Sequence, residues 1–246
     1  EEMEGAAHHL IDMVEPGEDF SAGKYVQLAD ACVQDILSRG KTAVIAGGTG
    51  LYVDSLIAGR SFAPVPQTGR REALEAQLRE TGGEAMLARL REIDPEAAAR
   101  LHPADEKRVI RALEVYEETG KTITQHNLET KAVPPRYRPV WIGLDYQDRA
   151  ALYRRIDLRV DQMMEQDLLN EAKCVWEHRD TYKTAAQAIG YKEFFPYFAG
   201  ESALAPCVEK LKQASRNYAK RQLTWFRHME GICWMDASAP DVREQA

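Results

Sequence analysis

The first 48 residues have the pattern of a strand, a helix and a second strand. The short apolar run HHLIDMV at residues 8–14 is followed by an amphipathic segment at 21–40 and by the apolar run TAVIAGG at 42–48. Two strands joined by a helix form a right-handed parallel crossover, which is the building unit of α/β folds. The pattern therefore predicts an α/β protein with a parallel sheet.

The helix of this unit has one apolar face and two recognisable ends. Ser21 suits the N-cap, and Gly40 suits the left-handed residue that follows a last helical turn. At helical spacing, we expect the buried face to consist of Val26, Ala29, Val33, Ile36 and Leu37.

A long helical stretch interrupts the strand pattern, which returns near residue 138. Residues 64–135 contain only helical signals, with Pro95 and Asp105 at helix starts and Gly120 at a helix end. RPVWIGLDY at 138–146 and GICWMD at 231–236 then predict strands, separated by a long amphipathic segment at 149–178 and by helices at about 185–227. We predict an α/β core of residues 1–63 and 136–246, with an all-helical insertion domain at 64–135.

Charge is distributed unevenly along this acidic chain. The net charge is −7, yet residues 205–228 hold six Lys or Arg side chains against Glu209, whereas residues 1–24 are strongly acidic. No apolar run is long enough to cross a bilayer and the start has no signal-peptide pattern, so we expect a cytoplasmic protein without a membrane partner. The four cysteines are far apart, which predicts free thiols and no structural metal site.

Two GKT strings resemble part of a nucleotide-binding loop but do not form one. A phosphate loop needs GxxxxGK[ST] between a strand and a helix, whereas Asp35 and Val115 stand where the first glycine is required. Both strings follow helices, so we interpret Gly40 and Gly120 as helix stops.

Three short segments could carry chemistry, and each has a plainer alternative. The turn Gly47, Gly48 and Thr49 precedes a helix and could approach an anion, or it could simply connect a strand to a helix. Lys107, Arg108 and Arg111 oppose the dipole of their helix unless an anion compensates, although a solvated face would also explain them.

The third segment is LYRRIDLRVDQMM, in which Arg155 and Arg159 lie one turn apart. Their guanidinium groups could grip a diphosphate, or they could pair with Asp157 and Asp161 of the same helix.

The basic segment near the C-terminus, SRNYAKRQLTWFRHMEG, mixes cations with aromatic side chains. Arg216, Lys220 and Arg227 could contact phosphates while Tyr218 and Trp225 stack on unpaired bases. An ordinary amphipathic helix would also account for the pattern.

Six motifs taken together resemble the tRNA dimethylallyltransferase (isopentenylpyrophosphate transferase) family. They span nearly the whole chain in the family's order: HHLIDMVEP, AGGTGLYVDSL, LHPADEKRVIRALEVYEETGK, LYRRIDLRVDQMM, AIGYKE and AKRQLTWFR. The resemblance implies a P-loop-NTPase-like parallel-sheet core and transfer of a dimethylallyl group from dimethylallyl diphosphate to N6 of the adenosine beside the tRNA anticodon. Family members begin with a phosphate loop and a segment bearing the general-base aspartate, neither of which occurs in these residues. We therefore expect the chain alone to be inactive and Mg²⁺ to bind largely through that segment and the substrate diphosphate.

The resemblance also implies roles for individual residues. Arg159 is expected to contact the diphosphate as a catalytic residue, Gly47 and Gly48 to form the turn before a helix, and the protein to act as a monomer on an anticodon stem-loop that the helical insertion grips. The residues expected to contact tRNA are Thr49, Arg71, Lys107, Arg108, Val109, Ile110, Arg111, Gln187, Gly190, Tyr191, Lys192, Lys220, Arg221, Gln222, Thr224, Trp225 and Arg227.

Two other functions compete with this interpretation. An adenylate isopentenyltransferase belongs to the same superfamily but prenylates a free nucleotide. A noncatalytic RNA-binding module would not need a phosphate loop. The helical insertion and the AKRQLTWFR segment favour tRNA as the substrate.

Overall fold

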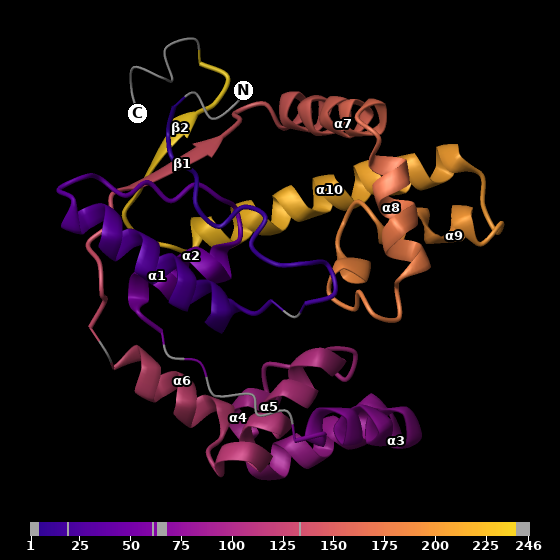
Figure 1. Cartoon of the computed structure of the whole chain (residues 1–246). Helices are drawn as coiled ribbons and strands as arrows, with labels where there is room; N and C mark the ends of the chain where they lie inside the picture. Colours follow the sequence, from indigo (N-terminus) through magenta and orange to yellow (C-terminus); the bar gives the residue numbers. More distant parts are fainter. Residues whose placement is uncertain (1–4, 19, 61, 63–67, 133, 240–246) are drawn as a thin grey trace. The chain divides into compact units, whose positions relative to one another are not determined.

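The computed structural model divides the chain into two compact units (Figure 1). Unit 1 consists of Glu1–Asp54 and Arg138–Ala246, and unit 2 of Ser55–Tyr137. The structure describes residues 5–18, 20–60, 62, 68–132 and 134–239. The predicted domain boundary at residues 63 and 64 lies outside these described residues.

Unit 1 combines a small sheet with helices. β1 (Trp141–Asp145) and β2 (Ile232–Asp236) run parallel, with Trp141 opposite Ile232 and Asp145 opposite Asp236. The chain between these strands forms α7 (Arg149–Glu165), α8 (Leu168–Glu177), α9 (Phe195–Phe198) and α10 (Leu204–Arg227), with 3-10 turns at Ala185–Gln187 and Lys192–Phe194. Before β1 lie α1 (Ala22–Ser38) and α2 (Gly50–Ala58), the latter crossing the border of the two units.

The sheet confirms two predicted strands and shows that two others were wrong. β1 and β2 lie inside the predicted runs at 138–146 and 231–236. Residues 8–14 form no strand because Leu10 and Asp12 have φ angles of 63° and 52°, which interrupt an extended chain. Residues 42–48 pair with no neighbouring strand in the described part of the chain, and Val44 is 84% exposed, unlike a residue in a buried parallel strand. The expected α/β core is therefore a mostly helical chain with a two-stranded parallel sheet.

The end signals of α1 were predicted correctly, and its buried face was predicted in part. The Ser21 hydroxyl accepts a hydrogen bond from the Lys24 amide at 3.2 Å, and Gly40 has a φ of 67°. Val26, Ala29 and Val33 are buried, whereas Leu37 is 46% exposed and Ile36 is half-buried. The buried face is thus shorter than expected and ends one turn before the helix does.

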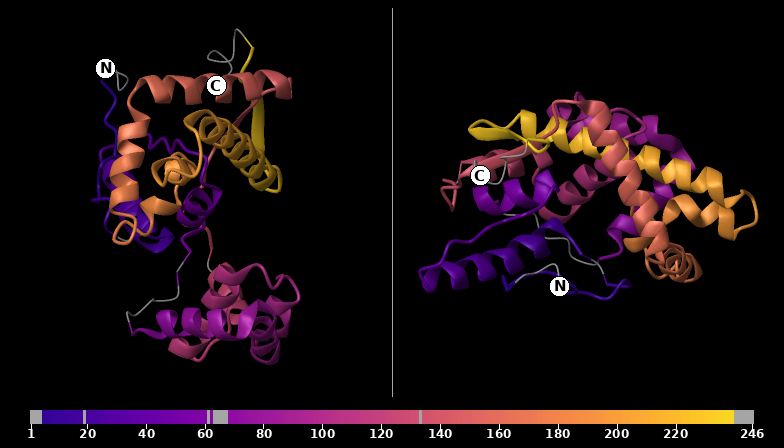
Figure 2. Two further views of the ribbon diagram at one scale, coloured as in Figure 1. Left: turned by 90° about the vertical axis from the view of Figure 1, so that its right-hand side faces the viewer. Right: turned by 90° about the horizontal axis from the view of Figure 1, so that it is seen from above.

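The core of unit 1 brings α7, α8 and α10 together. Val160 of α7 packs with Leu168 and Ala172 of α8, with Phe194, and with Cys207 and Leu211 of α10. The long segment predicted at 149–178 is two helices, because Asp167 adopts a left-handed φ of 72° that ends the first and redirects the chain. Figure 2 shows α7, α8 and α10 from two further directions. This arrangement places one side of α7 opposite α10.

Unit 2 is entirely helical in its described residues. It consists of α3 (Arg70–Ile93), α4 (Pro95–Ala98), α5 (Glu106–Thr119) and α6 (Ile123–Lys131). Pro95 starts α4, and Gly120 ends α5 with a φ of 71°, as predicted. Asp105 occupies the N-cap of α5, but its carboxylate accepts a hydrogen bond from the His102 amide and none from the first turn of the helix. The core is formed by Leu74, Met86, Leu87, Leu90, Ala98, Val109, Ile110, Ala112 and Leu113.

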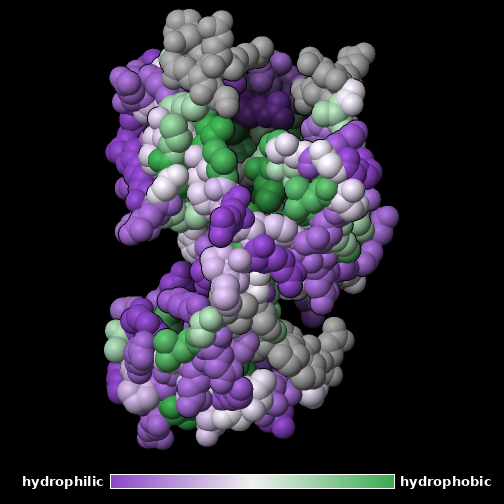
Figure 3. All heavy atoms as spheres, turned by 90° about the vertical axis from the view of Figure 1, so that its left-hand side faces the viewer, coloured by the Kyte–Doolittle hydropathy of each residue, from purple (hydrophilic) through white to green (hydrophobic). Residues whose placement is uncertain are grey.

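Apolar side chains are exposed around the small sheet of unit 1. Ile142 and Leu144 of β1 are 44% and 59% exposed, and hydrophobic residues gather around a hollow in the face of unit 1 that Figure 3 shows. None of the described helices is long and apolar enough to cross a membrane.

Candidate functional site

Unit 1 contains a cavity of about 830 Å³ between α7, the loop at residues 187–192, and α10. Its apolar lining includes Ile156, Val160, Met163 and Ile189. Its polar lining is formed by Tyr146, Arg155, Arg159, Gln187, Lys192, Ser215, Tyr218, Arg221 and Gln222. We call this site the cationic cavity, because four of its lining side chains are positively charged and none is Asp or Glu.

The four cations of the cavity have no carboxylate partner among the described residues. Arg155 and Arg159 come from α7, Lys192 from the loop, and Arg221 from α10, and no Asp or Glu oxygen lies within 4 Å of any of their charged groups. Surface arginines on the same helices do have partners, since Arg154 pairs with Asp148 at 3.3 Å. Unbalanced positive charge around a concave site attracts an anion.

The acidic residues of α7 are directed to α10 instead. Arg216 pairs with Asp157, and Lys212 Nζ lies 2.7 Å from Asp161 Oδ1. The hydrogen bond that Lys212 donates to Asp161 raises the pKa of Lys212 above its ordinary value. Asp157 and Asp161 therefore bind side chains of α10 and do not pair with Arg155 and Arg159. The two arginines line the cavity instead.

The glycine turn at residues 47–49 reaches the cavity through Tyr218. The Thr49 hydroxyl lies 3.4 Å from the Tyr218 hydroxyl, and the Arg221 guanidinium stands 5.5 Å from the centre of the Tyr218 ring. A cation at that distance over an aromatic face is attracted by the ring. Thr49, Arg159 and Arg221 thus lie at or beside one cavity, although they are far apart in sequence.

The sequence indicated Tyr218 as a ring that could stack on an unpaired base, but the family resemblance did not place it among the expected tRNA contacts. It lines the cavity, is 38% exposed, and connects Thr49 to Arg221. Its spacing three residues before Arg221 on one helix could have indicated that the two side chains share a face.

Gly48 and Gly50 allow the turn to approach α10 closely. A Cβ atom at Gly48 would lie 2.0 Å from Gln222 Nε2, and one at Gly50 would lie 2.2 Å from Trp225 Cδ1. At Gly47 the space is open. The closest neighbours of Gly48 and Gly50 are therefore side chains of α10.

We predict that Gly50→Ala destabilises the protein by about 1 to 3 kcal/mol, because the indole of Trp225 must move to admit a methyl group. Thermal unfolding followed by circular dichroism measures the effect. Gly47→Ala is the matched control, since a Cβ there meets nothing within 4 Å. Equal melting temperatures for the two variants would contradict the packing role of Gly50.

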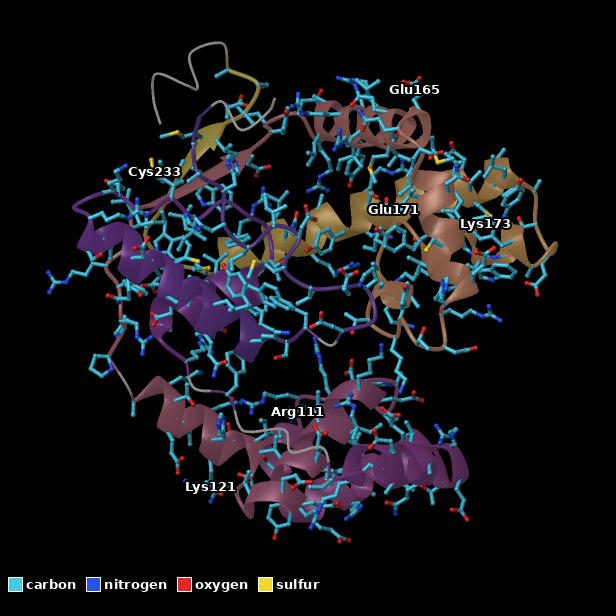
Figure 4. The ribbon with its side chains drawn as sticks, viewed as in Figure 1. Arg111, Lys121, Glu165, Glu171, Lys173 and Cys233 are labelled. Atoms are coloured by element: carbon cyan, nitrogen blue, oxygen red, sulfur yellow. The ribbon has the colours of Figure 1, made fainter. Side chains whose placement is uncertain are left out.

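The loop at 187–192 is held by internal hydrogen bonds. The Gly190 amide donates to Glu193 Oε2 at 2.9 Å, and the Tyr191 hydroxyl donates to Glu171 Oε1 of α8 at 2.8 Å (Glu171 is labelled in Figure 4). Burial and this bond to Glu171 raise the pKa of Tyr191 to about 12, so the hydroxyl stays protonated at neutral pH. Gln187 and Lys192, in contrast, line the cavity, and Lys192 Nζ donates to the Gln187 carbonyl at 3.1 Å.

The remaining predicted residues of α10 do not line the cavity. Lys220 is exposed, Thr224 donates its hydroxyl to the Lys220 carbonyl at 2.9 Å, and Trp225 is 43% exposed. Arg227 Nη2 lies 2.6 Å from Asp145 Oδ2 at the end of β1. Thr224 and Trp225 lie one turn after Arg221 on α10, whereas Lys220 and Arg227 lie on another side of the same helix.

Unit 2 holds the other predicted residues. Lys107 and Arg108 are exposed on the first turn of α5, and Arg111 is half-buried one turn later. Val109 and Ile110 are only 1% and 3% exposed and belong to the helical core. Their side chains stabilise unit 2, and a ligand at the surface of this unit could not reach them.

Comparisons with known proteins agree on one family. The IPP transferase family matches residues 1–229. A tRNA dimethylallyltransferase of Desulforamulus reducens is 44% identical over 237 residues, covering 96% of this chain and 83% of the relative.

Two solved structures resemble the chain in fold as well as sequence. The full-length tRNA isopentenylpyrophosphate transferase of Bacillus halodurans is 41% identical with a TM-score of 0.65, covering 96% of this chain and 73% of that one. A eukaryotic dimethylallyltransferase acting on tRNA is 29% identical with a TM-score of 0.79, covering 98% of this chain and 64% of that one.

Proposed function

Because the chain belongs to the IPP transferase family, we propose that it transfers a dimethylallyl group from dimethylallyl diphosphate to N6 of the adenosine beside a tRNA anticodon. Family membership confirms the resemblance expected from the sequence. The single observation that carries the chemistry is the cationic cavity, in which four cations that pair with no carboxylate of the described residues line a space of about 830 Å³. A diphosphate is the part of the substrate pair that needs such a site.

In the proposed reaction the cations of the cavity stabilise the leaving group. The bond between the allylic carbon and the diphosphate oxygen breaks with its electron pair on the oxygen, and a bond from N6 to that carbon forms. N6 releases one proton to the solvent, so the products are N6-dimethylallyl adenosine, diphosphate and a proton. Negative charge therefore grows on the diphosphate as it leaves. Arg159 and Arg155 present several N–H donors in a plane, which matches phosphate oxygens, and would stabilise that charge most strongly at the transition state.

The apolar part of the cavity suits the prenyl group. Ile156, Val160, Met163 and Ile189 lie beside the arginines in the same lining. Five carbons placed against these side chains would be removed from water, which is favourable, while the diphosphate remains among the cations. The adenine would enter near Thr49 and Tyr218, since an extruded base needs polar groups and an aromatic face.

We propose that RNA is held by groups in both units. In unit 1 these are the loop residues Gln187, Gly190, Tyr191 and Lys192 and the α10 residues Lys220, Arg221, Gln222, Thr224, Trp225 and Arg227. In unit 2 they are Arg71, Lys107, Arg108 and Arg111, on the helical insertion that we propose binds the anticodon stem. The mixture of cations and aromatic rings supports contact with a partly unpaired RNA.

Mg²⁺ does not fit the cavity as a protein-bound ion. Mg²⁺ prefers carboxylate and water oxygens, whereas the cavity lining has arginine, lysine and no carboxylate. In the described part of the chain, no three His, Cys, Asp or Glu side chains gather as a metal site.

The 246 residues contain no GxxxxGK[ST] motif. We propose that prenyl transfer by these residues alone is much slower than by a chain that carries such a loop, because backbone amides of a phosphate loop bind the other side of a diphosphate. Comparing turnover of the two chains tests this directly.

The function is tested by incubating the protein, with and without an added phosphate-loop segment, with dimethylallyl diphosphate and either an anticodon stem-loop or AMP. We expect N6-prenylated adenosine in the stem-loop and none in AMP, detected by mass spectrometry of the nucleosides. Prenylated AMP with an unmodified stem-loop would instead indicate an adenylate isopentenyltransferase. RNA binding without transfer, even with the loop present, would leave a noncatalytic RNA-binding role.

A further inference from the structure

Glu114 of α5 is a buried carboxylate that connects two arginines from different helices. Its side chain is 3% exposed, and its Oε2 lies 3.3 Å from Arg71 Nη1 of α3 and 2.8 Å from Arg111 Nη1 of α5. The two arginine side chains remain 40% and 30% exposed. One buried charge thus sits below two guanidinium groups that reach the surface of unit 2 (Figure 4 labels Arg111).

Burying the Glu114 carboxylate costs free energy unless Arg71 and Arg111 compensate its charge. A carboxylate removed from water is strongly destabilised when it is unpaired, and two neighbouring guanidinium groups repel each other. Sharing Oε2 offsets both terms and restricts the directions in which the two arginines can point. Arg71 also pairs through Nε with Glu75 Oε1 at 3.3 Å. A guanidinium carries five N–H donors, so Arg71 keeps donors that neither glutamate uses.

We infer that Glu114 is a positioning residue for RNA binding, which holds Arg71 and Arg111 so that their outward N–H groups contact phosphates of the RNA backbone. The inference rests on the proposed function, because it takes RNA as the ligand of these arginines. Glu114 itself does not touch the RNA. It fixes the geometry of two groups that do.

The direction in which Glu114→Gln changes the affinity for RNA separates the positioning role from a purely electrostatic effect. Glu114→Gln keeps the shape of the side chain but removes one negative charge, and extra positive charge alone would make RNA bind more tightly. If Arg71 and Arg111 lose their fixed geometry, RNA should instead bind more weakly. We expect the Kd for an anticodon stem-loop to rise about tenfold, which is the size of losing one well-placed arginine contact.

Glu117→Gln is the matched control. Glu117 lies one turn further along α5, pairs with Arg89 at 2.6 Å and Arg70 at 3.9 Å, and undergoes the same change of charge. We expect this variant to bind the stem-loop as tightly as the unchanged protein or more tightly. Fluorescence anisotropy with a labelled stem-loop, repeated at several salt concentrations, measures both variants. Equal or tighter binding by Glu114→Gln would overturn the inference.

A second variant covers the case in which Glu114→Gln does not fold, as judged by circular dichroism. Arg111→Lys keeps a cation opposite Glu114 but removes the additional donors, and we expect it also to weaken binding about tenfold. Unchanged binding by Arg111→Lys would overturn the inference.

The test also distinguishes this inference from the proposed function. If the unchanged protein prenylates the stem-loop and Glu114→Gln binds it normally, the inference fails and the function stands. If Glu114→Gln loses affinity but no prenyl transfer occurs, the positioning role stands and the function fails.

Discussion

Replacing Arg159 with alanine is expected to lower the turnover number for prenyl transfer by about 100-fold or more, in line with the removal of other transition-state charge contacts. The reason is that Arg159 lines the cationic cavity and pairs with no carboxylate in the part of the chain that the structure describes, so that it can stabilise the departing diphosphate. The Kd for the anticodon stem-loop should change by less than about threefold, because a contact to the leaving group adds little to RNA binding. Single-turnover kinetics and anisotropy titrations on the same preparation measure the two quantities.

Arg154→Ala is the control for this experiment. Arg154 lies on the same helix, carries the same charge and pairs with Asp148 at 3.3 Å outside the cavity lining. It should leave turnover nearly unchanged. If Arg159→Ala reduced turnover and RNA affinity equally, or neither, Arg159 could not be the diphosphate contact.

Replacing Lys220 and Arg221 together with alanine is expected to weaken stem-loop binding by about 10 to 100-fold near physiological salt. Lys220 is exposed on α10, and Arg221 lies over the Tyr218 ring at the cavity. If each side chain neutralises one phosphate of a single strand, the slope of log Kd against log salt should flatten by about 1.4. Titrations at four or more salt concentrations give that slope.

Lys173→Ala with Lys210→Ala provides the same loss of charge elsewhere in unit 1. Both lysines are exposed, on α8 and near the start of α10, and neither lines the cavity. We expect the salt slope of this control to stay close to that of the unchanged protein. A slope that does not change when Lys220 and Arg221 are removed would exclude them from the interface.

The local parts of the fold were predictable because they depend on nearby residues. Ser21 caps α1 through its own hydroxyl, Gly120 ends α5 in a left-handed conformation, and Pro95 begins α4. The runs at 138–146 and 231–236 form strands because each supplies the other with hydrogen bonds. The runs at 8–14 and 42–48 were equally apolar, but a strand needs a neighbour, and periodicity does not reveal which runs pair.

The sequence predicted which cations belong to the candidate site, but not how they are arranged in space. The sequence indicated Arg159 and Arg221, yet their charges could have been neutralised by Asp157 or Asp161. The turn at Asp167 and the packing of α7 on α10 decide that these carboxylates face Arg216 and Lys212. The burial of Val109 and Ile110 was likewise decided by the packing of unit 2.

The positive charge gathered around the cavity also bears on how the protein evolves. Like charges around one cavity repel each other. The same four cations that bind a polyanion therefore lower the stability of the folded protein when no ligand is bound. A mutation that swapped one of these arginines for an uncharged residue would relieve that repulsion while impairing the site. Selection for stability and selection for catalysis therefore act in opposite directions at this cavity, so we expect stabilising substitutions to be tolerated in other parts of the molecule.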